Sequence, residues 1–188
     1  MAQRRFQLKR LWLLFIIIVF MGVWHKSILR IYFVFDYKDK IISYSTSNGI
    51  SAALICAVVF TESRFDPLAK SHKGALGLMQ IMPQTGNWVA QRILDSPLST
   101  AALLDPDNNL AVGIWYMAYL KRHFQNNENL ALASYNAGTS YVQDWVKQGV
   151  WEGDAVKVDQ IPFPETRKYV LRVIMLEKIY RYLYPELS

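Results

Sequence analysis

Glu62 is a carboxylate whose neighbours in the sequence could tune it for proton transfer. It follows the apolar run Val58-Val59-Phe60 and lies seven residues after Ile55, so on a helix it shares a face with apolar side chains. Burial on such a face disfavours the charged form and raises the pKa of a carboxyl group toward the neutral range that a general acid needs. The alternative is an ordinary charge at a helix end.

Cleavage of a glycosidic bond normally uses two carboxylates, one on each side of the bond. Asp66 is the nearest second candidate, and it directly precedes Pro67. An Asp in such a turn commonly accepts a hydrogen bond from the following backbone, so we expect a structural role for Asp66. If Glu62 acts on a sugar, the substrate must then supply what a second carboxylate would provide.

Two short glycine-containing stretches could approach a ligand. In Lys73-Gly-Ala-Leu-Gly-Leu-Met-Gln80, two glycines three residues apart lie beside a polar Gln, and a tight turn explains them equally well. In Ser134-Tyr-Asn-Ala-Gly138, an aromatic face and an amide suit sugar recognition. A helix C-cap at Gly138 explains this second stretch nearly as well.

The elements that would position these residues are helices. Apolar periodicity, caps and breakers predict helices over residues 37–46, 51–64, 84–94, 105–124, 130–135, 141–147 and 168–184. Ser51 and Asp105 open two of them, and Asn48-Gly49 ends the first. Residues 65–78 are predicted to form a turn or short hairpin, and residues 161–164 an extended linker. We therefore expect one mainly α-helical domain over residues 36–188.

The N-terminal segment differs in character from this domain. Leu11–Trp24 carries no charge and follows four basic residues, but its 14 residues are fewer than the roughly 20 of a membrane-spanning helix. Small residues of a signal-peptide cleavage site do not follow it, and apolar character resumes over residues 28–35. We interpret residues 1–35 as an uncleaved signal-anchor with its N-terminus inside, which places residues from 36 onward outside the cytoplasmic membrane. Cleavage, giving a secreted domain, is the alternative.

Charge and cysteine content exclude several classes of function. The net charge of +6 comes from residues 1–30, which hold six basic and no acidic residues and leave 15 of each sign in the remainder. This neutral remainder argues against a nucleic-acid-binding protein. Cys56 is the only cysteine and has apolar neighbours, which predicts a buried inert thiol. The three histidines lack the spacing of metal ligands, so we expect no metal and no cofactor.

Five motifs occur in a particular order along the chain. They are Glu62-Ser-Arg-Phe-Asp-Pro, Ser71-x-x-Gly-Ala, Gly77-Leu-Met-Gln-Ile-Met-Pro83, Ala133-x-Tyr-Asn-Ala-Gly138 and Pro164-Glu-Thr-x-x-Tyr169-Val. This order resembles the soluble lytic transglycosylase family, whose catalytic domain is lysozyme-like. The resemblance runs from about residue 37 to residue 184, and the segments Asp105-Pro-Asp-x-Asn-Leu110 and Gly113-x-x-Tyr-Met-x-Tyr-Leu120 also fit it.

The resemblance implies cleavage of the β-1,4 bond between N-acetylmuramic acid and N-acetylglucosamine in peptidoglycan, leaving a 1,6-anhydro end. It implies that Glu62 is the sole catalytic acid and base and that Ser71 hydrogen-bonds at the catalytic subsite, holding Glu62 or the acetamido group. The positions that match the sugar groove are Gln80, Met82, Tyr135, Asn136 and, from the last segment, Glu165. We expect a monomer whose partners are peptidoglycan strands and, through residues 1–35, the membrane.

Two alternative functions remain open from the sequence. A hydrolase resembling goose-type lysozyme would use the same fold and leave reducing ends. A non-catalytic peptidoglycan-binding protein would keep the groove without the chemistry, although the presence of Glu62 and Ser71 argues against it.

Overall fold

The computed structural model describes residues 10, 12, 19–20, 22, 24–94 and 96–187. The chain divides into two compact units, Met1–Phe35 and Asp36–Ser188. In the first unit, residues 24–32 are helical. Among the described residues, no helix has both the length and the apolar character needed to cross a membrane. Most of Leu11–Trp24 lies outside the described residues, so the signal-anchor stays a prediction.

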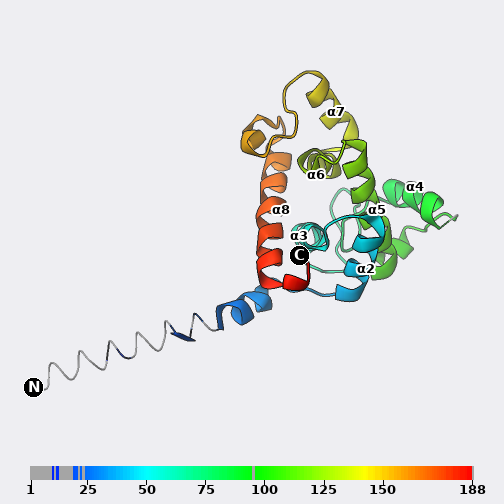
Figure 1. Cartoon of the computed structure of the whole chain (residues 1–188). Helices are drawn as coiled ribbons and strands as arrows, with labels where there is room; N and C mark the ends of the chain where they lie inside the picture. Colours follow the sequence, from blue (N-terminus) through cyan, green and yellow to red (C-terminus); the bar gives the residue numbers. More distant parts are fainter. Residues whose placement is uncertain are drawn as a thin grey trace, which may run out of the picture. The chain divides into compact units, whose positions relative to one another are not determined.

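The second unit is mainly α-helical, as the sequence predicts (Figure 1). Its α-helices are α2 (Lys38–Asn48), α3 (Ala52–Glu62), α4 (Pro83–Ile93), α5 (Pro106–His123), α6 (Glu128–Ala137), α7 (Thr139–Lys147) and α8 (Pro164–Leu183). Short 3-10 helices, which the sequence patterns did not reveal, are η1 (Ala101–Leu104), η2 (Ala155–Gln160) and η3 (Pro185–Leu187).

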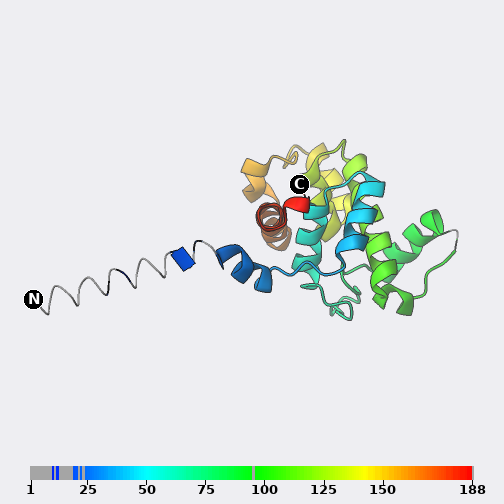
Figure 2. The ribbon, with the colours of Figure 1, turned by 60° about the horizontal axis from the view of Figure 1, so that its bottom comes forward.

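Helix α3 forms the centre of the core. Residues 53–60 are buried all round the helix, because α8, α2 and neighbouring segments surround it. Figure 1 shows α3 end-on with α8 alongside, and Figure 2 shows α8 end-on instead. The predicted cap is confirmed, since the Ser51 hydroxyl accepts a hydrogen bond from the Leu54 amide at 3.2 Å. Cys56 is fully buried, as expected, and burial raises the pKa of its thiol.

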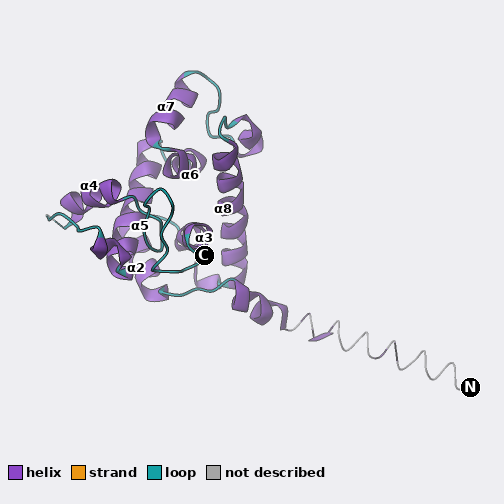
Figure 3. Cartoon of the chain, turned by 180° about the vertical axis from the view of Figure 1, so that it is seen from behind, coloured by secondary structure: helices purple, strands orange, loops and turns teal. Residues whose placement is uncertain are grey.

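The segment between α3 and α4 is a compact series of turns, drawn as loop in Figure 3. Isolated antiparallel β-bridges join Leu76 to Lys70 and to Ile81, which agrees with the predicted turn or short hairpin. The Asp66 carboxylate accepts a hydrogen bond from the Leu68 amide at 2.9 Å, so its predicted role as a turn former is confirmed.

Three helices begin two or more residues earlier than the sequence patterns predicted. Asn127 caps α6 by accepting from the Leu130 amide at 3.1 Å, so this helix starts at Glu128. Helix α7 starts at Thr139, directly after Gly138. Helix α8 starts at Pro164, which the sequence had assigned to an extended linker. Proline suits the first helical position because the amide hydrogen it lacks has no intrahelical partner there.

Candidate active site

Glu62 is the last residue of α3 and is partly buried. Residues 53–60 of α3 are apolar and buried. The Glu62 carboxyl group therefore lies at the edge of the core, partly shielded from water. The pKa of Glu62 is raised to about 7, mainly by burial; the Tyr169 hydroxyl lowers it in part, and the nearby Glu165 charge contributes a smaller increase. A carboxyl group with this pKa is both protonated and ionised in substantial amounts at neutral pH, so it can donate a proton and later accept one.

Two tyrosines from later helices lie near the Glu62 carboxyl. Burial, and then the charge of Glu62, raise the pKa values of Tyr135 in α6 and Tyr169 in α8 well above 10. Both hydroxyls therefore stay neutral at physiological pH. The buried Tyr169 hydroxyl has no partner at full hydrogen-bond geometry among the described residues, but it lies near enough to Glu62 to favour the carboxylate. Tyr169 lies in the motif that begins at Pro164, but it was not among the predicted site residues.

Glu165, at the start of α8, and Asn136, at the end of α6, lie in the same region as Glu62. Glu165 lies exposed in the first turn of α8, and its charge acts on the Glu62 carboxyl as described above. The Asn136 side-chain oxygen accepts a hydrogen bond from the Thr166 hydroxyl at 2.8 Å. This bond ties the end of α6 to the start of α8 and leaves the Asn136 amide nitrogen able to donate elsewhere.

The three site residues predicted between α3 and α4 have different environments. The Gln80 amide nitrogen donates to the carbonyl oxygens of Ala69 and Gly77 at 3.1 and 3.0 Å, so it braces the turn. Met82 is 42% exposed and occupies the N-cap position of α4. The Ser71 hydroxyl oxygen accepts from the Ala75 amide at 2.9 Å. In the described part of the chain, this hydroxyl pairs with Ala75 and not with Glu62, and its hydrogen is left to donate.

Asn109 of α5 holds the segment over residues 76–79 in place. Its side-chain oxygen accepts from the Met79 amide at 2.8 Å, and its nitrogen donates to the carbonyl oxygens of Leu76 and Leu103 at 2.9 and 2.8 Å. Asn109 is fully buried, so these bonds satisfy groups that water cannot reach. Asn109 lies within the segment Asp105–Leu110 noted above, but this role was not predicted from the sequence. Asp107 and Asn108 directly precede it, so no local pattern distinguished Asn109 from an exposed polar residue.

The end of α3 is joined to the same segment by Ser63. Its hydroxyl donates to the Leu78 carbonyl oxygen at 2.8 Å. The Tyr135 hydroxyl donates to the adjacent Met79 carbonyl oxygen at 2.7 Å. Side chains from α5 and α6 and the residue following α3 thus fix one short segment beside Glu62, which makes this wall of the site rigid.

Potential metal ligands are dispersed over the described part of the second unit. Among the residues that the structure describes, His, Cys, Asp and Glu side chains form no group of three that could hold a metal ion. The Glu62 carboxyl group, with a pKa of about 7 and with two neutral tyrosines nearby, could both donate and accept a proton. Such a site suits acid and base catalysis on an uncharged substrate such as a glycan.

Comparison with known proteins places this arrangement in a family. The family model described as "Transglycosylase SLT domain" matches residues 39–157. The soluble lytic murein transglycosylase of Escherichia coli (strain K12) is 37% identical over 152 residues, which cover 80% of this chain and 24% of that protein. The membrane-bound lytic murein transglycosylase C of Edwardsiella ictaluri (strain 93-146) is 30% identical over 169 residues and covers 77% of this chain and 46% of that protein.

Solved structures give the same result. The 70 kDa soluble lytic transglycosylase of Escherichia coli superposes with a TM-score of 0.77 at 36% identity, covering 82% of this chain and 25% of that one. An inactive glutamate-to-glutamine mutant of Slt from Pseudomonas aeruginosa gives a TM-score of 0.73 at 34% identity, with the same coverage. This chain spans about a quarter of the length of these soluble relatives. It belongs to the transglycosylase SLT domain family.

Proposed function

We propose that the protein is a peptidoglycan lytic transglycosylase that cleaves the bond between N-acetylmuramic acid and N-acetylglucosamine without adding water. The observation that carries the proposal is the Glu62 carboxyl group, partly buried at the end of α3 with a pKa of about 7. Family membership and the names of the relatives support the same reaction.

The proposed reaction uses Glu62 twice. Protonated Glu62 donates its proton to the glycosidic oxygen as the bond from C1 to that oxygen breaks, and the 2-acetamido oxygen of the muramyl residue stabilises the positive charge at C1. The muramyl 6-hydroxyl then bonds to C1 and returns its proton to the Glu62 carboxylate. The ring closure is intramolecular, so it competes well against water at C1.

The remaining predicted residues have supporting roles in this scheme. Tyr135, Met82 and Asn136 would contact the sugar rings, while Gln80 braces the backbone beneath them. Ser71 would donate its hydroxyl hydrogen to the acetamido group or to Glu62. Glu165 raises the pKa of Glu62 and thereby favours the protonated form that begins the reaction.

Digestion of purified sacculi followed by mass spectrometry tests the proposal. We expect anhydro-muropeptides, which are lighter by one water than hydrolytic products. Glu62→Gln should fold and release none of them, whereas Asp66→Asn should stay active because an amide oxygen can still accept from Leu68. Reducing-end products would indicate a lysozyme-like hydrolase. Binding without any release would indicate a non-catalytic wall-binding protein.

We also propose that residues 1–35 anchor the enzyme, as a monomer, in the cytoplasmic membrane with the helical unit facing the periplasm or cell wall. The uncharged run Leu11–Trp24 and the preceding basic residues support this placement. The full-length chain should remain in the membrane fraction after alkaline carbonate extraction. Recovery in the soluble fraction, with an N-terminus beyond residue 24, would show cleavage and secretion instead.

A further inference from the structure

One side of α8 presents apolar and basic side chains to the surface. Residues three or four positions apart share a side of a helix, and here they are Lys168, Leu171, Arg172, Met175 and Lys178. We call these five residues the outer stripe of α8. Its two apolar side chains are 51% and 54% exposed, and its three basic residues are exposed as well.

The stripe takes no part in the core of the helical unit. Helix α8 packs on α3 and α6 through other residues, and Figure 1 shows both of these helices on the same side of α8. The buried residues that α8 contributes are Thr166, Tyr169, Val170, Val173, Leu176, Tyr180 and Leu183. In the described part of the chain, none of the three basic side chains of the stripe forms an ion pair. The one acidic residue within its span, Glu177, pairs with Arg181 at 2.6 Å.

The end of α8 lies beside the point where the chain enters the helical unit. Glu186 of η3, which directly follows α8, accepts a hydrogen bond from the Lys38 ammonium group at 2.7 Å. Lys38 is the first residue of α2, and only Asp36 and Tyr37 separate it from residues 1–35. If residues 1–35 anchor the chain, this short connection keeps the unit near the lipid surface, which raises the effective concentration of lipid around the stripe.

The chemistry of the stripe matches an anionic membrane surface. Lys and Arg side chains are attracted to the negative headgroups, and their long stems lie along apolar surface while the charges stay in water. Leucine and methionine between them can enter the boundary between headgroups and acyl chains. A second copy of α8 fits less well, because it would bring three more positive charges against the three of the stripe.

We propose that the outer stripe of α8 docks on an anionic phospholipid surface, with Leu171 and Met175 at the acyl-chain boundary and the basic side chains among the phosphates. The inference rests on the proposed membrane anchor and adds a second contact, which fixes how the helical unit lies on the membrane. Helix α3, which ends at Glu62, packs on another side of α8. The docked unit therefore keeps α8 between the lipid and α3, and its catalytic carboxyl group stays accessible to glycan strands.

Fluorescence of the full chain in lipid vesicles tests the docking. Met175→Cys carries an environment-sensitive dye, and Cys56 stays unlabelled because it is fully buried. The vesicles contain phosphatidylcholine alone or mixed with phosphatidylglycerol, with nitroxide quenchers on the acyl chains. Both leaflets have the same composition, so the direction of insertion does not affect the result. We expect a shift of the emission to shorter wavelength and strong quenching in the mixed vesicles only.

A triple substitution removes the charge of the stripe. Each basic residue near an anionic surface contributes about fivefold to binding, so Lys168→Gln/Arg172→Gln/Lys178→Gln should weaken the docking roughly a hundredfold and abolish the quenching.

Two controls match these variants in charge and in exposure. The charge control is Arg122→Gln/Lys147→Gln/Lys157→Gln, which removes as many charges from exposed residues outside α8 and should leave the quenching unchanged. The position control carries the dye at Leu94→Cys. Leu94 is 43% exposed at the end of α4, on the opposite side of the unit from α8 in Figure 1, so this dye should not be quenched.

Each other outcome counts against the docking. An unquenched dye at position 175 in mixed vesicles, with the chain floating with them, would overturn the docking and leave the anchor intact. Equal quenching in phosphatidylcholine alone, or at position 94, would show that the stripe does not select an anionic surface. A wavelength shift that grows with protein concentration without quenching would assign the stripe to a second copy. A chain that does not float with the vesicles would overturn both the docking and the anchor.

Discussion

The hydroxyl of Tyr135 donates a hydrogen bond to the carbonyl oxygen of Met79 at 2.7 Å, across 56 residues of sequence. This bond joins α6 to the segment beside Glu62 and fixes the orientation of the Tyr135 ring. The same ring also packs against the Tyr116 ring at 5.7 Å between centroids, so Tyr135 contacts both the Met79 segment and α5.

Tyr135→Phe should destabilise the protein and reduce its activity. The substitution keeps the ring but leaves the Met79 carbonyl oxygen without its partner, which costs about 1–2 kcal/mol in the free energy of unfolding. Urea denaturation measures this cost, and turbidity clearing of sacculi measures activity. Tyr141→Phe is the matched control because Tyr141 is exposed. Equal stability of the two variants would contradict the bracing role.

Gly77 and Gly74 should differ sharply in their tolerance of alanine. Both have positive φ angles, 73° and 87°, so Ala strains the backbone at either position. A Cβ atom on Gly77 would also collide with Asn109 and lie 2.7 Å from the Leu103 carbonyl oxygen, whereas one on Gly74 meets nothing within 4 Å. We expect the free energy of unfolding to fall by about 1 kcal/mol in Gly74→Ala and by about 3 kcal/mol or more in Gly77→Ala.

Chemical denaturation of both variants checks this difference. The Gly77→Ala protein should also lose activity, because the Asn109 hydrogen bonds that hold Met79 would have to rearrange. Similar losses at the two glycines would mean that backbone strain alone matters and that the close approach to Asn109 does not.

The pH dependence of cleavage should report the pKa of Glu62. Because the free enzyme must carry a protonated Glu62 to start the reaction, kcat/KM should fall as the pH rises above about 7. Glu165→Gln removes a negative charge that raises this pKa, so the alkaline limb should move to lower pH. Initial rates on soluble glycan strands between pH 4 and 9 would show the shift.

A suitable control for the Glu165 prediction is Glu152→Gln, since Glu152 is an exposed carboxylate that does not contribute to the Glu62 shift. Its pH profile should match that of the unsubstituted enzyme. An alkaline limb that stays in place in Glu165→Gln would show that Glu165 does not act on Glu62 electrostatically.

Glu62→Gln should stabilise the folded protein at neutral and alkaline pH. The pKa of Glu62 rises on folding from 4.5 to about 7, so the folded state holds the proton more tightly than the unfolded state. Stability therefore falls as the pH rises from about 4.5 to about 7 and stays lower above that range. Removing the ionisable group avoids this loss, which is about 1–3 kcal/mol for a partly buried carboxyl group.

Thermal unfolding at pH 4 and pH 8 measures the effect. The melting temperature of Glu62→Gln should exceed that of the unsubstituted protein at pH 8, and the difference should shrink at pH 4, where both states of Glu62 are protonated. If the two proteins differed in melting temperature by the same amount at pH 4 and pH 8, burial of the Glu62 charge would not be the cause of the difference.

Local sequence patterns determined most of the helical elements and the position of Glu62 within them. The predicted caps at Ser51 and Asp105 accept the expected backbone hydrogen bonds, and Gly49 ends α2 with a left-handed φ of 63°. These features depend on residues within one helical turn, so the sequence alone reveals them. The starts of α6 at Glu128 and of α8 at Pro164 were misplaced, because Asn127 was predicted to break a helix and residues 161–164 to form an extended linker.

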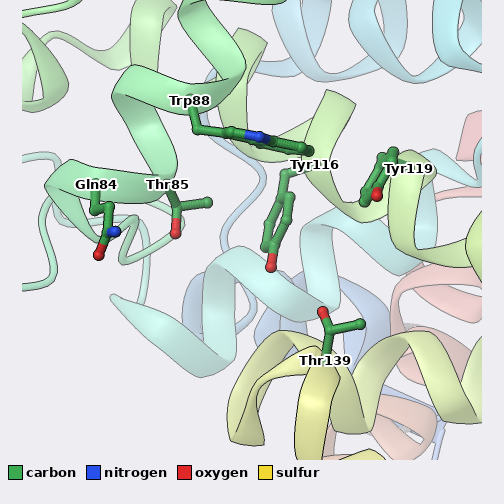
Figure 4. Close-up of a pocket in the computed structure, with 6 residues that line it drawn as sticks. All are labelled: Gln84, Thr85, Trp88, Tyr116, Tyr119 and Thr139. Atoms are coloured by element: carbon green, nitrogen blue, oxygen red, sulfur yellow. The ribbon is translucent and has the colours of Figure 1, made fainter. Parts of the chain in front are cut away.

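Only the tertiary structure decided how the site works around Glu62. The pKa of Glu62 is raised mainly by burial and is then adjusted by Tyr169 and Glu165, which are over 100 residues away in the sequence and are brought there by the packing of α8 against α3. Side chains of α4, α5 and the start of α7 similarly line one cavity (Figure 4). Burial and electrostatic interactions depend on distance in space, and sequence spacing does not encode that distance between separate helices. The sequence therefore predicts Glu62 as the acid, and the fold determines the pKa of its carboxyl group.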